Sequence, residues 1–150
     1  MNTNQSSSYC TFIVGWSLCG VRVDLVREVV SELACTPVPL SDRSISGLIN
    51  LRGQIVTVVD TSVCIGANEN AMETKPTNHV IVDVGDERMS LLVDDIGPVI
   101  EIENERIEPT PTNLKQSIPN FISETARVSE GIVLLLDVNR LAQLRHGSTS

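Results

Sequence analysis

The sequence has little positive charge and few aromatic side chains. Its 11 Lys and Arg residues face 19 Asp and Glu residues, so the 150-residue chain carries a formal net charge of −8. Such a chain has no cationic surplus to neutralise phosphates, and sequence-independent binding to nucleic acid or to an anionic membrane is not expected. The aromatic content of 3% also leaves few side chains on which bases could stack, which argues against a nucleic-acid-binding barrel.

Export and membrane signals are missing as well. The first eight residues are polar and contain no basic segment followed by an apolar one, so no secretory signal is predicted. No apolar run has the length needed to span a bilayer. The cysteines, which form neither a CxxC pair nor a zinc-binding pattern, are Cys10, Cys19, Cys35 and Cys64. We therefore expect reduced thiols in a soluble cytoplasmic protein.

Residues suited to catalysis are equally scarce. The only histidines are His79 and His146, and the sequence offers neither of them a convincing acid–base partner. Nucleophile elbows, glycine-rich phosphate loops and metal-ligand motifs are absent from the sequence. The adjacent carboxylates Asp94 and Asp95 are interpreted as a turn ending a strand, because neighbouring strand side chains point to opposite faces. We predict no enzymatic activity, no cofactor and no metal site.

Hydrophobic residues occur in short bursts separated by Gly, Asp, Asn, Ser and Pro, the pattern of strands and tight turns. Two short helical stretches are expected at 61–64 and 138–145, each preceded by an aspartate suited to capping. The expected strands are 9–14, 20–23, 27–30, 47–51, 54–60, 79–84, 88–93, 99–102, 122–128 and 132–137. Ten short strands with tight connections predict an all-β fold of barrels or a sandwich.

The chain also resembles itself at two offsets. Shifted by 70 positions, Gly15 aligns with Gly85, and shifted by 77, Asp60 aligns with Asp137. Aliphatic positions follow the same offsets, which indicates a duplicated five-strand unit. The larger offset in the second half fits a longer, proline-broken loop at 103–120.

The repeat predicts the domain organisation. A five-strand unit of this size suits an SH3-like barrel whose inward positions are filled by side chains. We predict one domain over 1–150, with 9–65 and the C-terminal helix as the first barrel and 79–137 as the second. Segments 1–8 and 146–150 are expected to be flexible tails. The two barrels would leave a groove between them.

The strongest local signal is the hairpin at 47–60, with Arg52 and Gly53 at its bend. This stretch resembles the NLRG-containing segment of the CheW family, coupling proteins that join bacterial chemoreceptors to a histidine kinase. Residues 26–29 are similar to the family's third strand, and 80–96 resembles the opening of its second subdomain.

The final strand of the family is similar to 131–137, so the resemblance covers most of the chain, roughly 9–144. It implies two tandem SH3-like five-stranded barrels with a short C-terminal helix around an apolar groove, and no enzymatic activity. It further implies a cytoplasmic signal-transduction adaptor that is recruited to membrane-associated receptor arrays.

The resemblance also implies partners and site residues. The groove would take the tip of a chemoreceptor's helical hairpin, and the first barrel would dock on the regulatory domain of a CheA-type histidine kinase. The receptor-facing positions are Val26, Glu28, Gly47, Arg52, Ile96 and Val99, with Glu28 and Arg52 as a pair. The kinase-facing positions are Leu33, Val38 and Leu40. For the aliphatic positions core packing is an equal alternative, and self-association in arrays is left open.

Two alternatives and one departure accompany this interpretation. A CheW-like scaffold of a non-flagellar array, controlling pili, biofilm or second-messenger output, fits the same residues. A small ligand-binding barrel or enzyme would instead use the groove, with Asp94 or Glu28 as a functional carboxylate. The clearest departure from the family is the turn at Trp16, where the family usually has a short acidic hairpin.

Overall fold

The computed structural model describes residues 5–38, 42–67, 77–111, 118, 121–142 and 144 of the chain. Within them, the strands are β1 (Ser6–Val14), β2 (Ser17–Arg22), β3 (Val26–Ser31), β4 (Ile45–Leu51), β5 (Gln54–Asp60), β6 (Asn78–Val84), β7 (Glu87–Val93), β8 (Asp95–Glu103), β9 (Ile107–Pro109), β10 (Ile122–Val128) and β11 (Gly131–Leu136). The helical elements are α1 (Thr61–Cys64) and the 3₁₀ turns η1 (Val23–Leu25), η2 (Asn104–Arg106) and η3 (Val138–Leu141).

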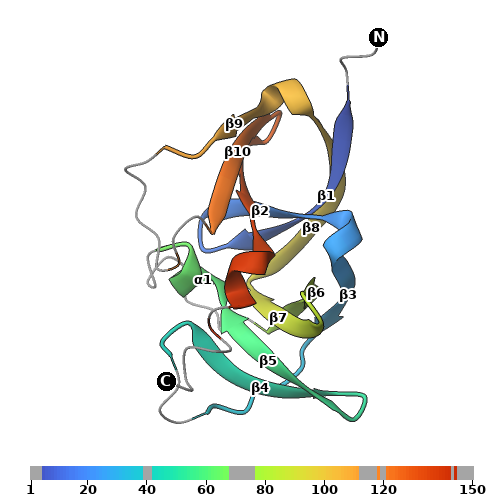
Figure 1. Cartoon of the computed structure of the whole chain (residues 1–150), viewed down its shortest axis with the longest axis vertical. Coiled ribbons are helices and arrows are strands. Elements are labelled where there is room, and N and C mark those ends of the chain that lie inside the picture. Colours follow the sequence, from blue (N-terminus) through green and yellow to red (C-terminus); the bar gives the residue numbers. More distant parts are fainter. Residues whose placement is uncertain are drawn as a thin grey trace.

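The strands form two sheets, and Figure 1 shows β9 and β10 at one end of the molecule and β4 and β5 at the other. Sheet A has the order β8-β1-β2-β11-β10-β9, and sheet B has the order β3-β6-β7-β5-β4. Neighbouring strands are antiparallel except β2 with β11 and β5 with β7, which are parallel. The all-β prediction is confirmed, and the architecture is that of two SH3-like barrels.

Each sheet takes strands from both halves of the chain. The hairpin β1–β2 belongs to sheet A with β8, β10 and β11, whereas the hairpin β6–β7 belongs to sheet B with β3, β4 and β5. The division into 9–65 and 79–137 therefore does not match the sheets. The repeat makes the two hairpins similar, so the sequence pattern could not show which sheet each hairpin joins.

The repeat itself accounts for matching local features. Gly15 and Gly85 open the β1–β2 and β6–β7 turns with φ values of 62° and 61°, a conformation that favours glycine. Asp60 accepts a hydrogen bond from the backbone N–H of Ser62, and Asp137 accepts one from that of Asn139. Both aspartates therefore cap the helical turn that follows them, as predicted.

Buried side chains form one core between the sheets and one inside each sheet. The inter-sheet core draws on both sheets, α1 and η3, and includes Phe12, Leu91, Phe121 and Leu141. Fully burying a side chain of this size contributes about 1.5–3 kcal/mol. The interior of sheet A includes Tyr9, Ile102, Ala126, Val133 and Leu135, and that of sheet B includes Ile49, Leu51, Val56, Val58 and Ile81.

Three predicted boundaries need correction. β1 begins at Ser6, within the expected flexible tail, because Ser6 pairs with Glu103 of β8. The expected proline-broken loop contains η2 and the short edge strand β9, which pairs with β10. The predicted closing helix is present as η3, while residues 143 and 145–150 lie outside the described part of the chain.

Candidate functional site

The β4–β5 turn presents Arg52 on a constrained backbone. Arg52 has a φ of 51° and Gly53 a φ of 85°, the two left-handed residues of a type I′ hairpin turn. Asn50 Oδ1 accepts a hydrogen bond of 2.8 Å from the Gly53 backbone N–H. The turn therefore fixes where the Arg52 side chain begins.

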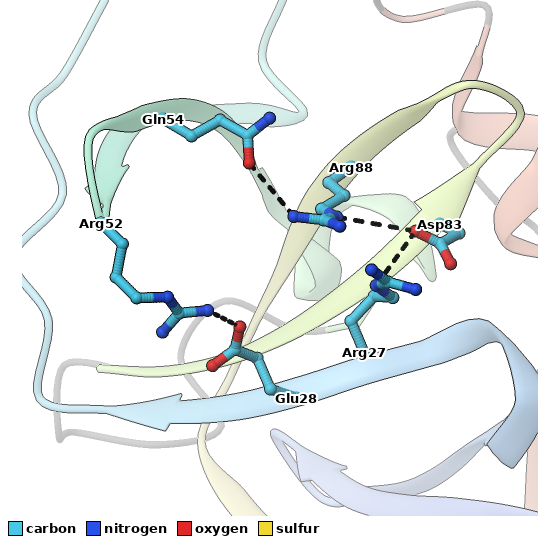
Figure 2. Close-up of polar contacts among 6 residues, drawn as sticks. All are labelled: Arg27, Glu28, Arg52, Gln54, Asp83 and Arg88. Atoms are coloured by element: carbon cyan, nitrogen blue, oxygen red, sulfur yellow. Dashed lines mark hydrogen bonds and ion pairs between the residues drawn. The ribbon is translucent and has the colours of Figure 1, made fainter.

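Arg52 and Glu28 form the ion pair that the resemblance implied. Arg52 Nη2 donates a hydrogen bond to Glu28 Oε2, from the β4–β5 turn to β3 (Figure 2). This hydrogen bond lowers the pKa of Glu28, and the charges of Arg52, Arg88 and Arg27 act in the same direction. Glu28 in turn raises the pKa of Arg52 through the same bond. Because the pair faces solvent, its contribution to fold stability is small, and its main effect is on side-chain position.

Four further side chains lie near this pair on sheet B and form a second group of contacts (Figure 2). Asp83 lies between two arginines, with Oδ1 3.8 Å from Arg27 Nε and 4.0 Å from Arg88 Nε. Arg88 Nη1 also donates to Gln54 Oε1 at 3.2 Å. We call the set the charged rim; it consists of Arg27, Glu28, Arg52, Gln54, Asp83 and Arg88.

A bulge in β3 explains why two consecutive residues, Arg27 and Glu28, both belong to the charged rim. Adjacent side chains of a regular strand point to opposite faces, but the β3–β6 register shifts between Val26 and Glu28. Arg27 and Glu28 consequently both extend toward the rim, as Figure 2 shows. No sequence pattern marks Arg27, Asp83 and Arg88 as neighbours, because their proximity depends on this bulge and on the pairing of β6 with β7.

Gly47, predicted to face the receptor, lies beneath a neighbouring backbone. Its φ is 153°, and a Cβ placed on it would lie 2.1 Å from the carbonyl oxygen of Thr36. Thr36 and Leu48 exchange two backbone hydrogen bonds of 2.8 Å in this region. Packing against the 33–38 segment therefore explains the glycine.

The remaining receptor-facing candidates lie on β3 and β8, which are edge strands of the two sheets. Val26 is half-buried and packs against the inter-sheet core. Ile96 and Val99 keep 37% and 61% of their surface exposed. Val29 is 42% exposed and was not among the candidates, although the offset of 70 that aligns it with Val99 was a usable signal.

The kinase-facing candidates lie in the connection from β3 to β4. Leu33 is half-buried and packs against the interior of sheet B. Val38 is also half-buried, and Leu40 lies outside the described residues. For Leu33, core packing is thus part of its role.

His79 has the partners that the sequence could not supply. The ring is fully buried in β6, with Nδ1 2.9 Å from Ser90 Oγ and Nε2 2.9 Å from the Leu33 carbonyl oxygen. No sequence pattern marks this arrangement, because it depends on the backbone carbonyl of Leu33, 46 residues away.

The carboxylates of the enzyme alternative both have structural partners. Asp94 Oδ2 accepts a 2.6 Å hydrogen bond from the Gly15 backbone N–H, and Glu28 is held by Arg52. The described part of the chain contains no cluster of three or more metal-ligating side chains. Among the same residues, no helix is both long and apolar enough to cross a bilayer.

Comparison with known proteins gives a consistent result. The family model described as CheW-like domain matches residues 8–146. The chemotaxis protein CheW of Rhizobium meliloti is 32% identical over 140 residues, covering 91% of this chain and 88% of that protein. The CheW of Treponema pallidum is 24% identical over 134 residues, covering 87% of this chain and 79% of that protein.

A solved structure shows the same architecture. The crystal structure of the scaffolding protein TtCheW from Thermoanaerobacter tengcongensis superposes with a TM-score of 0.79 at 26% identity, covering 89% of this chain and 90% of that one. The family match extends over nearly all of the chain, and apart from the first two residues of β1 both sheets fall within it. The chain therefore belongs to the CheW-like domain family.

Proposed function

We propose that this protein is a non-enzymatic adaptor that couples chemoreceptors to a CheA-type histidine kinase in bacterial chemotaxis. The observation that carries the proposal is the Glu28–Arg52 pair, exposed on the charged rim of a chain that matches the family over residues 8–146. The relatives named as chemotaxis proteins and the structure named as a scaffolding protein support it. Catalysis stays with the kinase.

The receptor tip would contact the charged rim and the exposed residues of the two edge strands. Ile96, Val99 and Val29 offer aliphatic surface, and Glu28 with Arg52 offers a fixed polar feature. An amphipathic helical hairpin can place apolar side chains on such a surface and polar ones beside it. Val26 and Gly47 would support this surface from below, since both are largely covered.

The kinase would contact the connection between β3 and β4, through Leu33, Val38 and Leu40. The described part of this connection is bonded to β4 through Thr36 and Leu48. A regulatory domain docked here would leave the edge strand β8 of sheet A available to the receptor. The adaptor would thus work in the cytoplasm and be recruited to receptor arrays. Holding two partners on one scaffold raises their effective concentration, which can strengthen assembly by ~10²–10⁴-fold.

Co-sedimentation with a receptor cytoplasmic fragment and a CheA-type kinase tests the proposal, using wild type, Arg52→Ala and the control Arg106→Ala. Arg106 is an exposed arginine in η2 that pairs with Glu103 at 3.3 Å, far from the charged rim in the sheet order. We expect wild type and the control to form the ternary complex. Arg52→Ala should lose about tenfold in receptor affinity, the effect of removing one interface anchor.

Two results would contradict the proposal. Wild type that captures neither fragment would exclude coupling of these partners. Equal receptor capture by all three proteins would exclude the charged rim as the receptor-facing site.

A further inference from the structure

We propose that the buried His79, oriented by Ser90, is a positioning residue that sets the path of the 33–38 segment. The effect on the kinase rests on the proposed function, whereas the effect on the segment's backbone rests on geometry alone. The segment carries Leu33 and Val38, two of the proposed kinase-facing residues.

The contacts of His79 fix its tautomer. The Leu33 carbonyl oxygen can only accept, so the Nε2 atom 2.9 Å away must carry the hydrogen. In the neutral ring Nδ1 is then an acceptor, and Ser90 Oγ, also 2.9 Å away, donates its hydroxyl hydrogen to it. One neutral tautomer therefore satisfies both bonds, and Ser90 holds the ring with its donor aimed at Leu33.

This polar pair lies next to an apolar interior. His79 and Ser90 are both fully buried. Ile81, two residues after His79 in β6 and paired with Ser90, belongs to the interior of sheet B. Two apolar residues would pack here without the cost of desolvating polar groups. They would, however, leave the Leu33 carbonyl without its side-chain donor. The pair is thus explained by the connection it holds.

Sheet A, which lacks such a polar pair, holds its equivalent connection in a different way. At an offset of 70, the counterparts of His79 and Ser90 in sheet A are Tyr9 and Gly20, which offer no such pair. Sheet A instead holds its own connection as β9, through three residue pairs with β10. In sheet B the equivalent ladder is reduced to the single bridge between Thr36 and Leu48. The hydrogen bond between His79 and the Leu33 carbonyl therefore attaches this connection to sheet B at a second point, where the β-ladder is a single bridge.

The backbone is closely defined on both sides of Leu33. Before it, Glu32 has a left-handed φ of 58°, and its N–H donates to the Thr77 carbonyl at 2.9 Å. Further along, Thr36 lies directly over Gly47. Leu33, between these points, is held by His79, so loss of that bond releases the start of the 33–38 segment.

Native-state hydrogen exchange of the full chain provides the test. The probes are the Thr36 and Leu48 amides, which form the single bridge, and the reference probes are the amides of the β9–β10 ladder. We expect His79→Leu to speed exchange of Thr36 and Leu48 at least tenfold more than that of the reference amides. His79→Gln retains a donor at the Nε2 position and should stay within about threefold of wild type.

Affinity for isolated partner fragments gives the second measurement. His79→Leu should weaken binding of the kinase regulatory domain about tenfold and leave binding of the receptor fragment unchanged. If His79→Leu fails to fold, Ser90→Ala, which removes only the orienting hydroxyl, is measured in its place with the same selective pattern expected at smaller size.

Equal acceleration of probe and reference amides would overturn the positioning role, because it would mark a general loss of stability. Selective acceleration with unchanged kinase affinity would overturn the link between the segment and the kinase. If wild type binds no kinase at all, the proposed function fails, while the exchange result still decides the role of His79.

Discussion

Sheets A and B are built on one plan and differ in what they present. Replacing each strand of sheet B by its repeat counterpart gives β8-β1-β2-β11-β10, the order of sheet A without β9. The registers match as well, since Thr57 pairs with Met89 in sheet B as Leu134 pairs with Cys19 in sheet A. Duplication has therefore preserved the backbone framework.

The charged rim exists on sheet B alone. At the repeat offsets, the counterparts of its six members are Gly97, Pro98, Ser129, Gly131, Ile13 and Leu18, none of which is charged. The two sheets also differ in their connections, a three-residue strand in sheet A and a single bridge in sheet B. The framework is shared, and the proposed recognition features are confined to the rims, edges and connections.

Glycine substitution should give the largest contrast between the sheets. Gly47→Ala places a Cβ against the Thr36 backbone, whereas Gly131→Ala in sheet A meets no atom within 4 Å. Both residues have positive φ, so the second variant reports backbone strain alone. We expect a loss of about 2–4 kcal/mol for Gly47→Ala and about 1 kcal/mol for Gly131→Ala. Urea unfolding measures both, and equal losses would show that the close approach of Thr36 is unimportant.

The second-largest contrast in stability is expected between two aspartates that the repeat aligns, Asp94 and Asp24. Asp94 accepts a hydrogen bond from the Gly15 N–H, whereas its counterpart Asp24 is exposed and pairs with Arg22 at 3.2 Å. Asp94→Ala leaves a backbone donor without its partner and should cost about 1–3 kcal/mol. Asp24→Ala should change the unfolding free energy by less than about 0.5 kcal/mol. The comparison fails if the two variants are equally stable.

The core shared by both sheets should make the protein sensitive to alkali. Burial raises the pKa of Cys19 and of Cys64 to about 12, from an ordinary value of 9.0. The unfolded thiols ionise first as the pH rises, so stability is full below pH 9 and falls between pH 9 and 12. Urea midpoints at pH 8 and pH 10.5 should differ more in wild type than in the Cys19→Ala/Cys64→Ala variant. An identical decrease would assign the effect to other groups.

The smallest effect should come from the charged rim. Arg52 lowers the pKa of Glu28, so the pair stabilises the fold above the ordinary carboxyl range, and that contribution is lost as the pH falls through the lowered pKa. The stability difference between wild type and Glu28→Gln should be small at pH 7 and vanish in acid. Ser129→Ala, at the Arg52 counterpart in sheet A, should show no such pH dependence. A difference that grows in acid would contradict the assignment.

Much of the strand pattern could be predicted from the sequence. The strands at 54–60 and 122–128 match β5 and β10 at both ends, because alternating aliphatic residues and turn signals mark them. β9 escaped prediction because three residues ending in Pro109 carry no periodic signal. The sheet to which each hairpin belongs could not be predicted, because the two hairpins have similar sequence patterns.

The candidate site was predicted less completely than the fold. Glu28 and Arg52 followed from the family resemblance, and the structure pairs them. The β3 bulge and the β6–β7 register bring together Asp83, Arg27 and Arg88, and neither feature can be predicted from the sequence pattern. The role of His79 depends on a hydrogen bond to a backbone carbonyl 46 residues away, and no sequence pattern marks that contact.

The most direct test of the adaptor role is whether both partners bind at once. A labelled receptor fragment is titrated with the protein in the presence and absence of a saturating kinase regulatory domain, and sedimentation velocity follows the size of the complex. The account predicts a ternary complex and a receptor affinity that the kinase domain does not reduce. Displacement of the receptor fragment by the kinase domain would show that the two share one surface and would contradict the proposed coupling.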